Sequence, residues 1–281
     1  MQTHELVAAD GVPLMWQEWP CAAARGTVLI VHGLGEHIGR YDALAKRLNE
    51  SGWRVAGADL RGHGRSGGAR GGLPRSDALL NDLSLVIDAV RAATSGPLVL
   101  LGHCMGGLIA SRFVAEGLGA PRAPWSREVD ALVLSSPALD PGMNAAQKLL
   151  LALLGRLAPN LAVGNGLKPA WISRDPAVVR AYVDDPLVHD RVTPALVRFI
   201  VDSGELVLRR APAWRVKTLL LYAGADRCVA PQGSAAFAAA AAARPVTARE
   251  FPNLFHEIFN EPERDQVIAA LQAWLAALAP A

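Results

Sequence analysis

The chain has 281 residues, of which 51% are hydrophobic and 19% charged, and its formal net charge is +2. This size and composition predict one sizeable core with a small insertion, while interspersed charges and three scattered cysteines argue against a nucleic-acid-binding protein and a disulfide framework. No apolar run is long enough to span a bilayer and the first ten residues lack a signal-peptide pattern, so we expect a cytoplasmic protein.

Short apolar runs alternate with amphipathic stretches along most of the chain. Residues 7–19 contain Asp10-Gly11, a tight-turn signal, and predict an antiparallel hairpin. Six further runs are typical of buried strands: 27–32, 54–59, 97–101, 131–135, 218–222 and 246–251. Helical patterns lie between most of them, including 41–51, 76–94 and 233–243. This alternation predicts an α/β fold with a mostly parallel sheet and helices on both faces.

Residues 141–210 interrupt the alternation, because they show helical patterns broken by prolines and glycines but no strand. Such a segment is too long for a simple connection between two core strands. We therefore expect a core formed by 1–140 and 211–281, with 141–210 inserted as a helical cap over the carboxyl ends of the strands. The helix expected near 145–157 has leucines on several sides, which indicates either packing within the cap or contact with an acyl chain or lipid surface.

The segment Gly102-His-Cys-Met-Gly-Gly107 follows an apolar run and precedes an apolar helical pattern. A strand, a sharp glycine-flanked turn and a helix form the nucleophile elbow, which raises one side chain above the edge of a sheet. The raised residue is Cys104, at the position where the usual Gly-x-Ser-x-Gly pattern has serine. The sequence therefore predicts a thiol nucleophile.

A nucleophile needs a base, and the base needs a carboxylate that orients its ring. Asp226 and His256 each follow a predicted strand, so both belong to loops at the edge of the sheet where Cys104 is expected. Their order after the nucleophile, acid and then histidine, is typical of this architecture. We predict a Cys104, His256 and Asp226 triad. Asp140 and Glu257 are rival acids, but neither follows the strand that normally supplies one.

Backbone N–H groups are the donors expected to stabilise the oxyanion of acyl transfer. One candidate is the N–H of Met105, at the start of the helix after the nucleophile. The other is the N–H of Leu34, in the glycine-rich loop 32–37. The motif at 59–66, Asp-Leu-Arg-Gly-His-Gly-Arg-Ser, lacks the phosphate-loop pattern and is expected to support the site through a hydrogen-bonded turn.

These motifs resemble those of the monoacylglycerol lipase and lysophospholipase branch of the α/β-hydrolases. The matching stretches span nearly the whole chain: 32–41, 59–66, 102–107, 134–137, 184–186 and 224–227. The resemblance implies an eight-stranded sheet with a helical cap, and cleavage of an ester between a long acyl chain and a glycerol-like alcohol, without a cofactor. It implies the same triad and oxyanion donors, and it places Arg40 and His103 near the alcohol.

The thiol of Cys104 leaves several interpretations open: a natural cysteine nucleophile, an engineered replacement of serine that cripples turnover, or an acyl-binding protein without turnover. Sulfur is larger than oxygen, and a misplacement of about 1 Å can lower a rate roughly a hundredfold. A thioester intermediate also makes an acyltransferase or thioesterase an alternative to a hydrolase. No ligand-spaced cluster of His and Cys surrounds Cys104, so no metal is expected, and Cys21 and Cys228 are expected to be structural.

Overall fold

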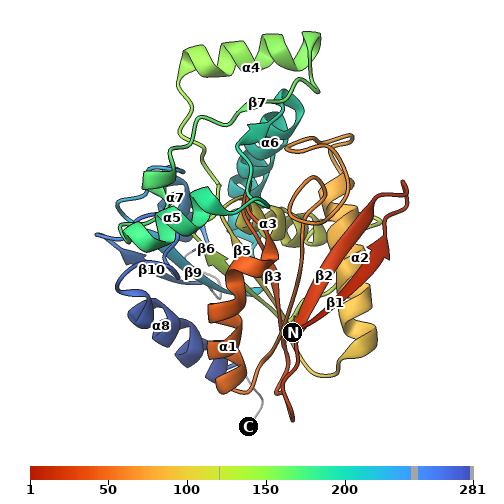
Figure 1. Cartoon of the computed structure of the whole chain (residues 1–281), viewed down its shortest axis with the longest axis vertical. Helices are drawn as coiled ribbons and strands as arrows, with labels where there is room; N and C mark the ends of the chain where they lie inside the picture. Colours follow the sequence, from red (N-terminus) through yellow and green to blue (C-terminus); the bar gives the residue numbers. More distant parts are fainter. Residues whose placement is uncertain (120, 242–245, 279–281) are drawn as a thin grey trace.

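The computed structural model describes residues 1–119, 121–241 and 246–278, and its centre is an eight-stranded sheet (Figure 1). The strand order is β1-β2-β4-β3-β5-β6-β9-β10, antiparallel between β1, β2 and β4 and parallel elsewhere. The strands are β1 (Gln2–Val7), β2 (Pro13–Trp19), β3 (Thr27–Val31), β4 (Arg54–Ala58), β5 (Leu98–His103), β6 (Ala131–Ser135), β9 (Lys217–Ala223) and β10 (Val246–Phe251). This is the α/β-hydrolase fold, as the resemblance implies, and its antiparallel start confirms the predicted hairpin.

Helices cover both faces of the sheet because successive residues of each central strand point to opposite sides. In β3, Val28 and Ile30 pack with α1 (Asp42–Glu50) and α8 (Arg264–Ala276). The alternate residues, Leu29 and Val31, belong to the cluster on the other face. That face is covered by α2 (Ala78–Ala93), α3 (Met105–Gly117), α6 (Pro194–Arg210) and α7 (Pro231–Ala240). Short 3-10 helices occur at Ile38–Tyr41 (η1), Pro169–Trp171 (η2) and Ala211–Ala213 (η3).

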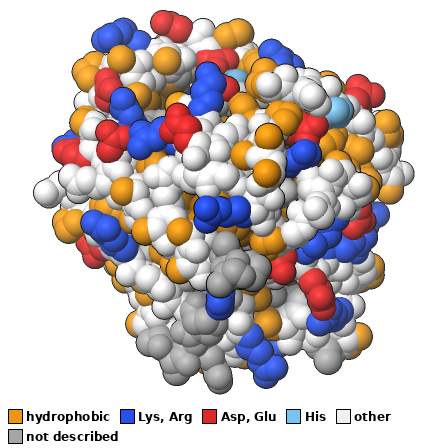
Figure 2. Space-filling view, turned by 90° about the horizontal axis from the view of Figure 1, so that it is seen from below, with side chains coloured by type: hydrophobic (Ala, Val, Ile, Leu, Met, Phe, Trp, Pro, Cys, Tyr) orange, Lys and Arg blue, Asp and Glu red, His pale blue; other side chains and the backbone are white. Residues whose placement is uncertain are grey.

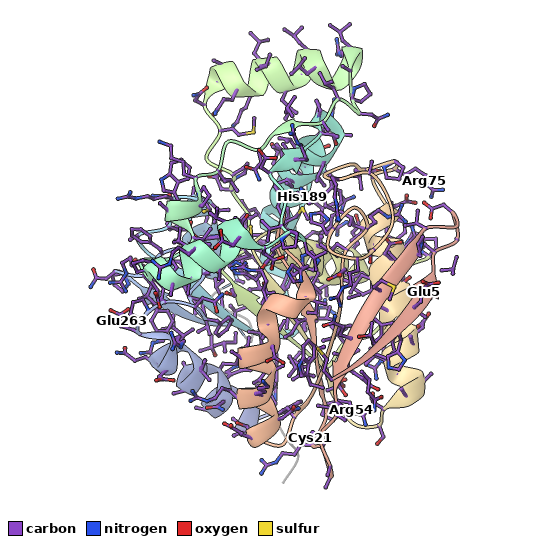
Figure 3. All side chains as sticks on the ribbon, viewed as in Figure 1. Glu5, Cys21, Arg54, Arg75, His189 and Glu263 are labelled. Atoms are coloured by element: carbon purple, nitrogen blue, oxygen red, sulfur yellow. The ribbon has the colours of Figure 1, made fainter. Side chains whose placement is uncertain are left out.

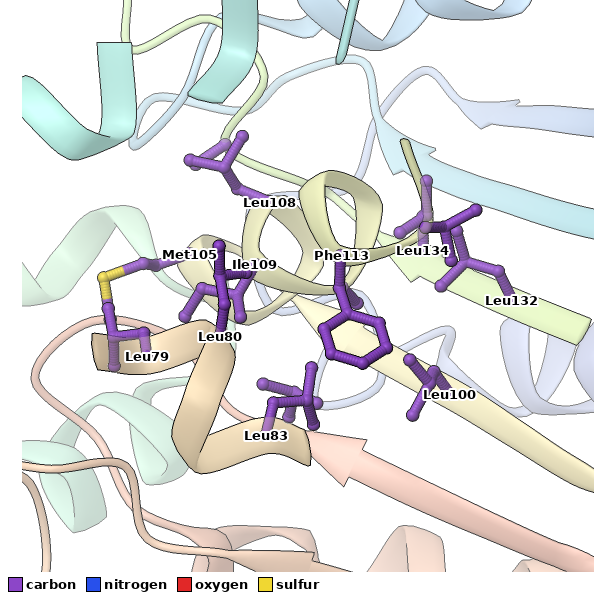
Figure 4. Close-up of a cluster of buried hydrophobic side chains, with 14 of the residues drawn as sticks. Leu79, Leu80, Leu83, Leu100, Met105, Leu108, Ile109, Phe113, Leu132 and Leu134 are labelled. Atoms are coloured by element: carbon purple, nitrogen blue, oxygen red, sulfur yellow. The ribbon is translucent and has the colours of Figure 1, made fainter. Parts of the chain in front are cut away.

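Helix α3 lies against β5 and forms part of a cluster of buried hydrophobic side chains (Figure 4). Ile109 and Phe113 are almost fully buried and pack with leucines from the neighbouring helix and strands: Leu80, Leu83, Leu100 and Leu132. Complete burial of one such side chain contributes about 1.5–3 kcal/mol to the stability of the folded protein. The start of α3, where Cys104 is located, therefore rests on a rigid base.

Two strand expectations were wrong. Strand β10 was expected to be buried, but residues 247–250 are exposed because β10 lies at the edge of the sheet. Its charged residues, Arg249 and Glu250, are typical of a protected edge strand. The segment 141–210 was expected to contain no strand, yet β7 (Val163–Gly164) pairs antiparallel with β8 (Arg191–Val192). Two-residue strands show no alternation that a sequence pattern could reveal.

The segment 141–210 contains α4 (Ala145–Leu157), α5 (Pro176–Asp184) and α6, and it reaches over the carboxyl edge of the sheet (Figure 1). Helix α6 packs on α3, where Arg112 donates a hydrogen bond to the Ser203 hydroxyl (2.9 Å). Helix α4 projects away from the sheet, and none of its residues is buried. The division into a core and an inserted cap stays a prediction.

The surface carries mixed charges. Figure 2 shows Lys and Arg side chains interspersed with Asp and Glu on the face seen from below, as expected for a net charge of +2. Within the described ranges, no helix combines the length and the apolar character needed to cross a bilayer.

Candidate active site

Cys104 lies in a sharp turn between β5 and α3, with φ of 52° and ψ of −122°. A non-glycine residue rarely adopts such angles, so the turn is strained and must be held by its surroundings. Flanking glycines allow it, because a Cβ on Gly106 would lie 2.0 Å from the Val31 carbonyl oxygen, and one on Gly102 would lie 2.5 Å from the Gly106 oxygen. Backbone hydrogen bonds also fix the turn, since the Cys104 N–H donates to Ser135 (3.0 Å).

His256 and Asp226 form a buried pair in the loops after β10 and β9. The His256 Nδ1 lies 2.7 Å from the Asp226 Oδ2. The other carboxylate oxygen accepts hydrogen bonds from the N–H groups of Cys228 (2.8 Å) and Val229 (3.1 Å). The orientation of the carboxylate is therefore set by the backbone, and the carboxylate in turn sets the orientation of the imidazole.

Electrostatics favours the ionised form of both partners. Burial alone would lower the pKa of His256, but the Asp226 carboxylate and the nearby thiols Cys104 and Cys228 outweigh burial and raise this pKa well above its ordinary value. Burial alone would raise the pKa of Asp226, but the charge of His256, its hydrogen bond and two backbone N–H groups lower it. A positive charge on His256 is thus stabilised in the folded protein.

Cys104, His256 and the glycine-rich loop line one small cavity of about 30 Å³. Among the described residues that line this cavity, no hydrogen bond joins the Cys104 thiol to the His256 ring. Catalytic hydrogen bonds are often long before substrate binds. Cys104 and His256 therefore line one cavity, and Asp226 is joined to it through its contact with the His256 ring. The contact between acid and base is formed, whereas the contact between base and nucleophile is open.

The glycine-rich loop approaches the nucleophile closely. A Cβ on Gly33 would lie 2.9 Å from the Cys104 Cβ, so only glycine fits there. The Gly33 N–H donates to Glu36 (2.7 Å), whereas Leu34 borders the cavity. Met105 is the first residue of α3, where backbone N–H groups have no partner within the helix. The roles of the Leu34 and Met105 amides as oxyanion donors stay a prediction.

Arg40 joins the glycine-rich loop to the loop after β10 that carries His256 and Glu257, called the histidine loop below. Its guanidinium donates to Glu36 (2.8 Å) and, through two nitrogens, to Glu257 (2.6 and 2.9 Å). It also stacks on the ring of Tyr182 from α5, with 4.8 Å to the ring centroid. Burial raises the pKa of Glu36, but Arg40 and nearby histidines dominate and hold it at about 2. The proposed place of Arg40 near the alcohol stays a prediction, and its ion pairs were not foreseen.

His103 lies next to His256. Its ring centroid is 4.7 Å from that of His256, and its Nδ1 is 3.1 Å from the carbonyl oxygen of Ser135. Burial and the charge of His256 lower the pKa of His103 to about 4, so its ring is neutral near pH 7. It borders the Cys104 cavity and also the adjoining cavity that Arg40 lines. Its predicted contact with the alcohol stays a prediction.

The two rival acids have other partners. Asp140 accepts a hydrogen bond from the N–H of Gly142 (2.8 Å), and Glu257 is paired with Arg40. Asp226 is the carboxylate that contacts His256 in the described chain. This geometry favours Asp226 as the acid.

The motif at 59–66 forms the expected hydrogen-bonded turn. The Asp59 carboxylate accepts from the N–H groups of Ile38 and Arg65, both at 2.8 Å. The N–H of Leu60 donates to the Nε2 of His32 (2.9 Å), which holds the start of the glycine-rich loop. The motif thereby supports the loop that faces Cys104.

The segment between α5 and β8 also contacts the glycine-rich loop. The N–H of His189 donates to Gly35 (2.9 Å), and the imidazole of His37 is 2.8 Å from the Asp185 carboxylate. The His189 side chain itself is half-buried. Gly35 has a φ of +78°, and a Cβ there would lie 2.3 Å from the His189 carbonyl oxygen. These contacts tie 141–210 to the expected oxyanion loop.

Cys228 and a set of residues from 141–210 reach the site without having been predicted. The cavity beside Cys104 is also lined by Cys228 and by Leu167, Lys168, Pro169, Ile172 and Tyr182. Cys228 was expected to be structural. Its position two residues after Asp226 was the available signal, but a loop sequence does not show where a side chain points.

Known proteins share this sequence and architecture. Residues 22–263 match the family model described as Serine aminopeptidase, S33. The monoacylglycerol lipase of Mycolicibacterium smegmatis is 35% identical over 277 residues, which are 97% of this chain and 96% of that protein. Phospholipase YtpA of Bacillus subtilis is 32% identical over 263 residues, which are 92% of this chain and 98% of that protein. The crystal structure of Paleococcus ferrophilus monoacylglycerol lipase matches with a TM-score of 0.81 and 33% identity, covering 94% of this chain and 99% of that one.

Proposed function

Because the chain belongs to the Serine aminopeptidase, S33 family, we propose that it is a carboxylic ester hydrolase acting on monoacylglycerol- or lysophospholipid-like esters. The observation that carries this proposal is the 2.7 Å contact between His256 and Asp226 at the cavity lined by Cys104. A base oriented by a carboxylate beside a nucleophile is the arrangement that acyl transfer requires. The similarity to a monoacylglycerol lipase and to a phospholipase supports the substrate class.

The proposed reaction proceeds through an acyl-enzyme. The proton of the Cys104 thiol passes to His256 before the attack, which leaves a thiolate beside an imidazolium, and the sulfur then attacks the ester carbonyl carbon. The resulting oxyanion accepts hydrogen bonds from the N–H groups of Leu34 and Met105. The C–O bond to the alcohol then breaks, and His256 returns its proton to the leaving alcohol. Water, deprotonated by His256, cleaves the thioester, releases the fatty acid and restores the thiol, while Asp226 keeps the imidazole oriented.

The alcohol is proposed to occupy the side of the cavity next to His103 and Arg40. His103 lines both adjoining cavities, and Arg40 lines the second of them. Neutral imidazole can donate to or accept from a hydroxyl group. Arg40 would act on the alcohol mainly through Glu257, since its own guanidinium is largely enclosed by ion pairs.

We propose that 141–210 acts as a mobile cap on the core formed by 1–140 and 211–281. A cavity of about 30 Å³ holds little more than one or two water molecules. A long-chain ester therefore requires residues such as Leu167, Ile172 and Tyr182 to move away from Cys104. Opening of the cap would expose the carboxyl edge of the sheet to substrate.

Helix α4 is proposed to contact the lipid that contains the substrate. Leu149, Leu150 and Leu153 are 64%, 55% and 52% exposed, which is unusual for leucines on one short helix. Residues 141–170 contain basic residues, including Lys148 and Arg156, but no acidic residue. Exposed apolar and basic side chains together suit an anionic lipid surface. A cytoplasmic location stays a prediction.

Acyl transfer or thioester hydrolysis is a second candidate, favoured by the thiol itself. An acyl group on Cys104 would be a thioester, which reacts with amines, thiols and alcohols as well as with water. If an amine, thiol or alcohol enters the opened cavity and accepts the acyl group in place of water, the same site acts as an acyltransferase.

The test compares the chain with Cys104→Ala and with the control Cys21→Ala. Cys21 is a free thiol that follows β2, lies near the bottom of the view in Figure 3, and is not among the residues that line the Cys104 cavity. Glycerol monoesters and activated esters of graded chain length serve as substrates. We expect the parent and the Cys21 variant to hydrolyse the esters and to trap one acyl group on Cys104, detected by peptide mass spectrometry. Cys104→Ala should form no adduct on residue 104, and its rate of hydrolysis should be at least about a thousandfold lower than that of the parent.

The products decide between the candidates. Fatty acid alone, in the presence of added glycerol or amine, supports the hydrolase, whereas acylated glycerol or amide supports the acyltransferase. Full activity of Cys104→Ala, or an acyl group on another residue, would refute Cys104 as the nucleophile. Cys104→Ser, assayed in parallel, shows whether the site works better around oxygen or around sulfur.

A further inference from the structure

Three kinds of metal-binding donor meet beside the Cys104 cavity. A carboxylate oxygen of Asp226, the sulfur of Cys228 and a ring nitrogen of His256 all lie within 4.8 Å of one another. Sulfur, imidazole nitrogen and carboxylate oxygen are the donor types that zinc selects in proteins. The proposed ester hydrolysis uses two of these residues and leaves the Cys228 thiol without a role.

We propose that Asp226, Cys228 and His256 form a binding site for a thiophilic divalent cation, with Zn²⁺ as the best match. Occupation of this site removes His256 and Asp226 from acid–base chemistry, so the cation acts as a reversible inhibitor. The inhibitory effect rests on the proposed function, whereas the binding of the cation does not.

The backbone holds the donors in place. Asp226 Oδ1 accepts hydrogen bonds from the N–H groups of Cys228 (2.8 Å) and Val229 (3.1 Å), so the carboxylate and the Cys228 Cα have a fixed spacing. The His256 ring is fixed to the same carboxylate at 2.7 Å. Zinc lies about 2.0–2.3 Å from such ligand atoms. Donors spread over at most 4.8 Å therefore need to move by only about 1 Å. The Cys228 sulfur closes in, while the 2.7 Å contact between His256 and Asp226 opens.

The cavity provides room for a fourth ligand. Cys228 and His256 line the same space of about 30 Å³ as Cys104. One water-sized sphere needs roughly 10–15 Å³. A tetrahedral zinc site with three protein ligands usually keeps a water in the fourth position. Here that position is open to water or to the sulfur of Cys104, and either arrangement blocks attack on an ester.

Charge balance also favours a dication. A coordinated thiol loses its proton, and the resulting thiolate and the Asp226 carboxylate neutralise a dication. Binding therefore releases protons, and the affinity for the cation rises with pH. The cation also competes with the contact between Asp226 and His256, which keeps binding reversible.

Cobalt provides a direct test, because Co²⁺ takes zinc sites and gives near-ultraviolet charge-transfer absorption when a thiolate is a ligand. The full-length, reduced and metal-free protein is titrated with Co²⁺ and then with Zn²⁺. We expect one equivalent of Co²⁺ to produce the band and one equivalent of Zn²⁺ to remove it. Cys228→Ser should lose the band and bind Co²⁺ at least tenfold more weakly, whereas Cys21→Ser should match the parent.

Asp226→Asn provides a second variant that removes charge with little change in shape. It should also weaken Co²⁺ binding at least tenfold, and near-ultraviolet circular dichroism checks that each variant is folded. The absence of a band at millimolar Co²⁺ would overturn the proposal. Retention of the band in Cys228→Ser would also overturn it, because the thiolate would then belong to another cysteine.

Ester hydrolysis gives an independent readout. Zn²⁺ should inhibit the parent and Cys21→Ser, and a chelator should restore the rate. Cys228→Ser, measured against its own rate without metal, should need at least tenfold more Zn²⁺ for half-inhibition. Equal sensitivity of this variant would contradict the assignment of Cys228. If no ester is hydrolysed at all, the proposed function fails while the cobalt titration still decides the metal site.

Discussion

A thiol at position 104 changes which protonation state of His256 is productive. A thiolate–imidazolium pair can attack directly, and its imidazolium then protonates the leaving alcohol. A serine in the same place needs a neutral imidazole that can accept the hydroxyl proton. The structure raises the pKa of His256 well above its ordinary value, chiefly through Asp226 acting against burial. The two nucleophiles should therefore respond to pH in opposite ways.

For the parent chain we expect kcat/KM to fall as pH rises through the raised pKa of His256, since deprotonation destroys the ion pair. For Cys104→Ser we expect kcat/KM to rise with pH as His256 becomes neutral. The midpoint of the serine variant should lie lower, because the Cys104 thiolate that helps to raise this pKa is gone.

Profiles of kcat/KM from about pH 5 to pH 10 with a soluble activated ester measure both slopes. Cys21→Ser is the control and should reproduce the parent profile. Two profiles that rise with pH at the same midpoint would show that neutral His256 is the base for both nucleophiles, and would contradict a productive ion pair.

Single residues were predictable from the sequence where a local pattern fixed their surroundings. Cys104 follows from glycines on either side of a strand-to-helix turn, and Asp226 and His256 follow from their places after strands. Cys228 was not predictable as part of the cavity, because its direction depends on how the loop turns around the Asp226 carboxylate. Arg40 was assigned to the alcohol, but its bond to Glu257 joins residues 217 positions apart, which no local pattern shows.

The helices and strands with strong sequence patterns were predicted to within a few residues. The wrong predictions share one cause, because the structure of those strands depends on tertiary contacts. Strand β10 has the apolar ends of a buried strand, but its exposure depends on its place at the edge of the sheet. Strands β7 and β8 are fixed by tertiary pairing of two residues each. For α4 the sequence left packing within the cap and exposure to lipid open, and the structure shows an exposed helix.

Helix α4 is held at its start by a reciprocal pair of hydrogen bonds between Asn144 and Gln147. Its packing adds little, and an isolated helix of this length is marginal in water. Replacing Leu149, Leu150 and Leu153 together by glutamine should weaken binding to vesicles of mixed phosphatidylglycerol and phosphatidylcholine roughly tenfold to a hundredfold, because burying each leucine contributes on the order of 1 kcal/mol or more.

Vesicle flotation measures the bound fraction, and a soluble short-chain ester measures the intact site, which should change less than about twofold. Val7→Gln is the matched control, because Val7 is 60% exposed on β1, far from α4. Unchanged vesicle binding of the triple variant, or equal loss in the Val7 variant, would exclude α4 as the lipid contact.

At the scale of the whole molecule, Arg40 connects parts of the chain that form the site. Its partners Glu36 and Glu257 lie on the glycine-rich loop and the histidine loop, and Tyr182 lies on α5. The side chains of Arg40, Glu36 and Glu257 are 11%, 5% and 6% exposed, so this is a buried ion network. Removing one member of such a network leaves its partners as uncompensated buried charges.

Arg40→Met keeps most of the volume and removes the charge. We expect the free energy of unfolding to fall by about 3–5 kcal/mol, measured by urea denaturation. Neutralising the stranded acids in Arg40→Met/Glu36→Gln/Glu257→Gln should recover a large part of that loss. Arg122→Met removes an exposed pair with Glu128 and should change stability by less than about 1 kcal/mol.

Kinetics then separate two roles for Arg40. If it positions the loops around Cys104, Arg40→Met lowers kcat for glycerol esters and methyl esters of the same acyl chain alike, because both need the same oxyanion and base. If it binds the alcohol, KM rises for the glycerol ester and stays unchanged for the methyl ester. Its enclosure between two glutamates favours the first outcome. A selective rise of KM with unchanged stability would instead place the guanidinium in the alcohol site.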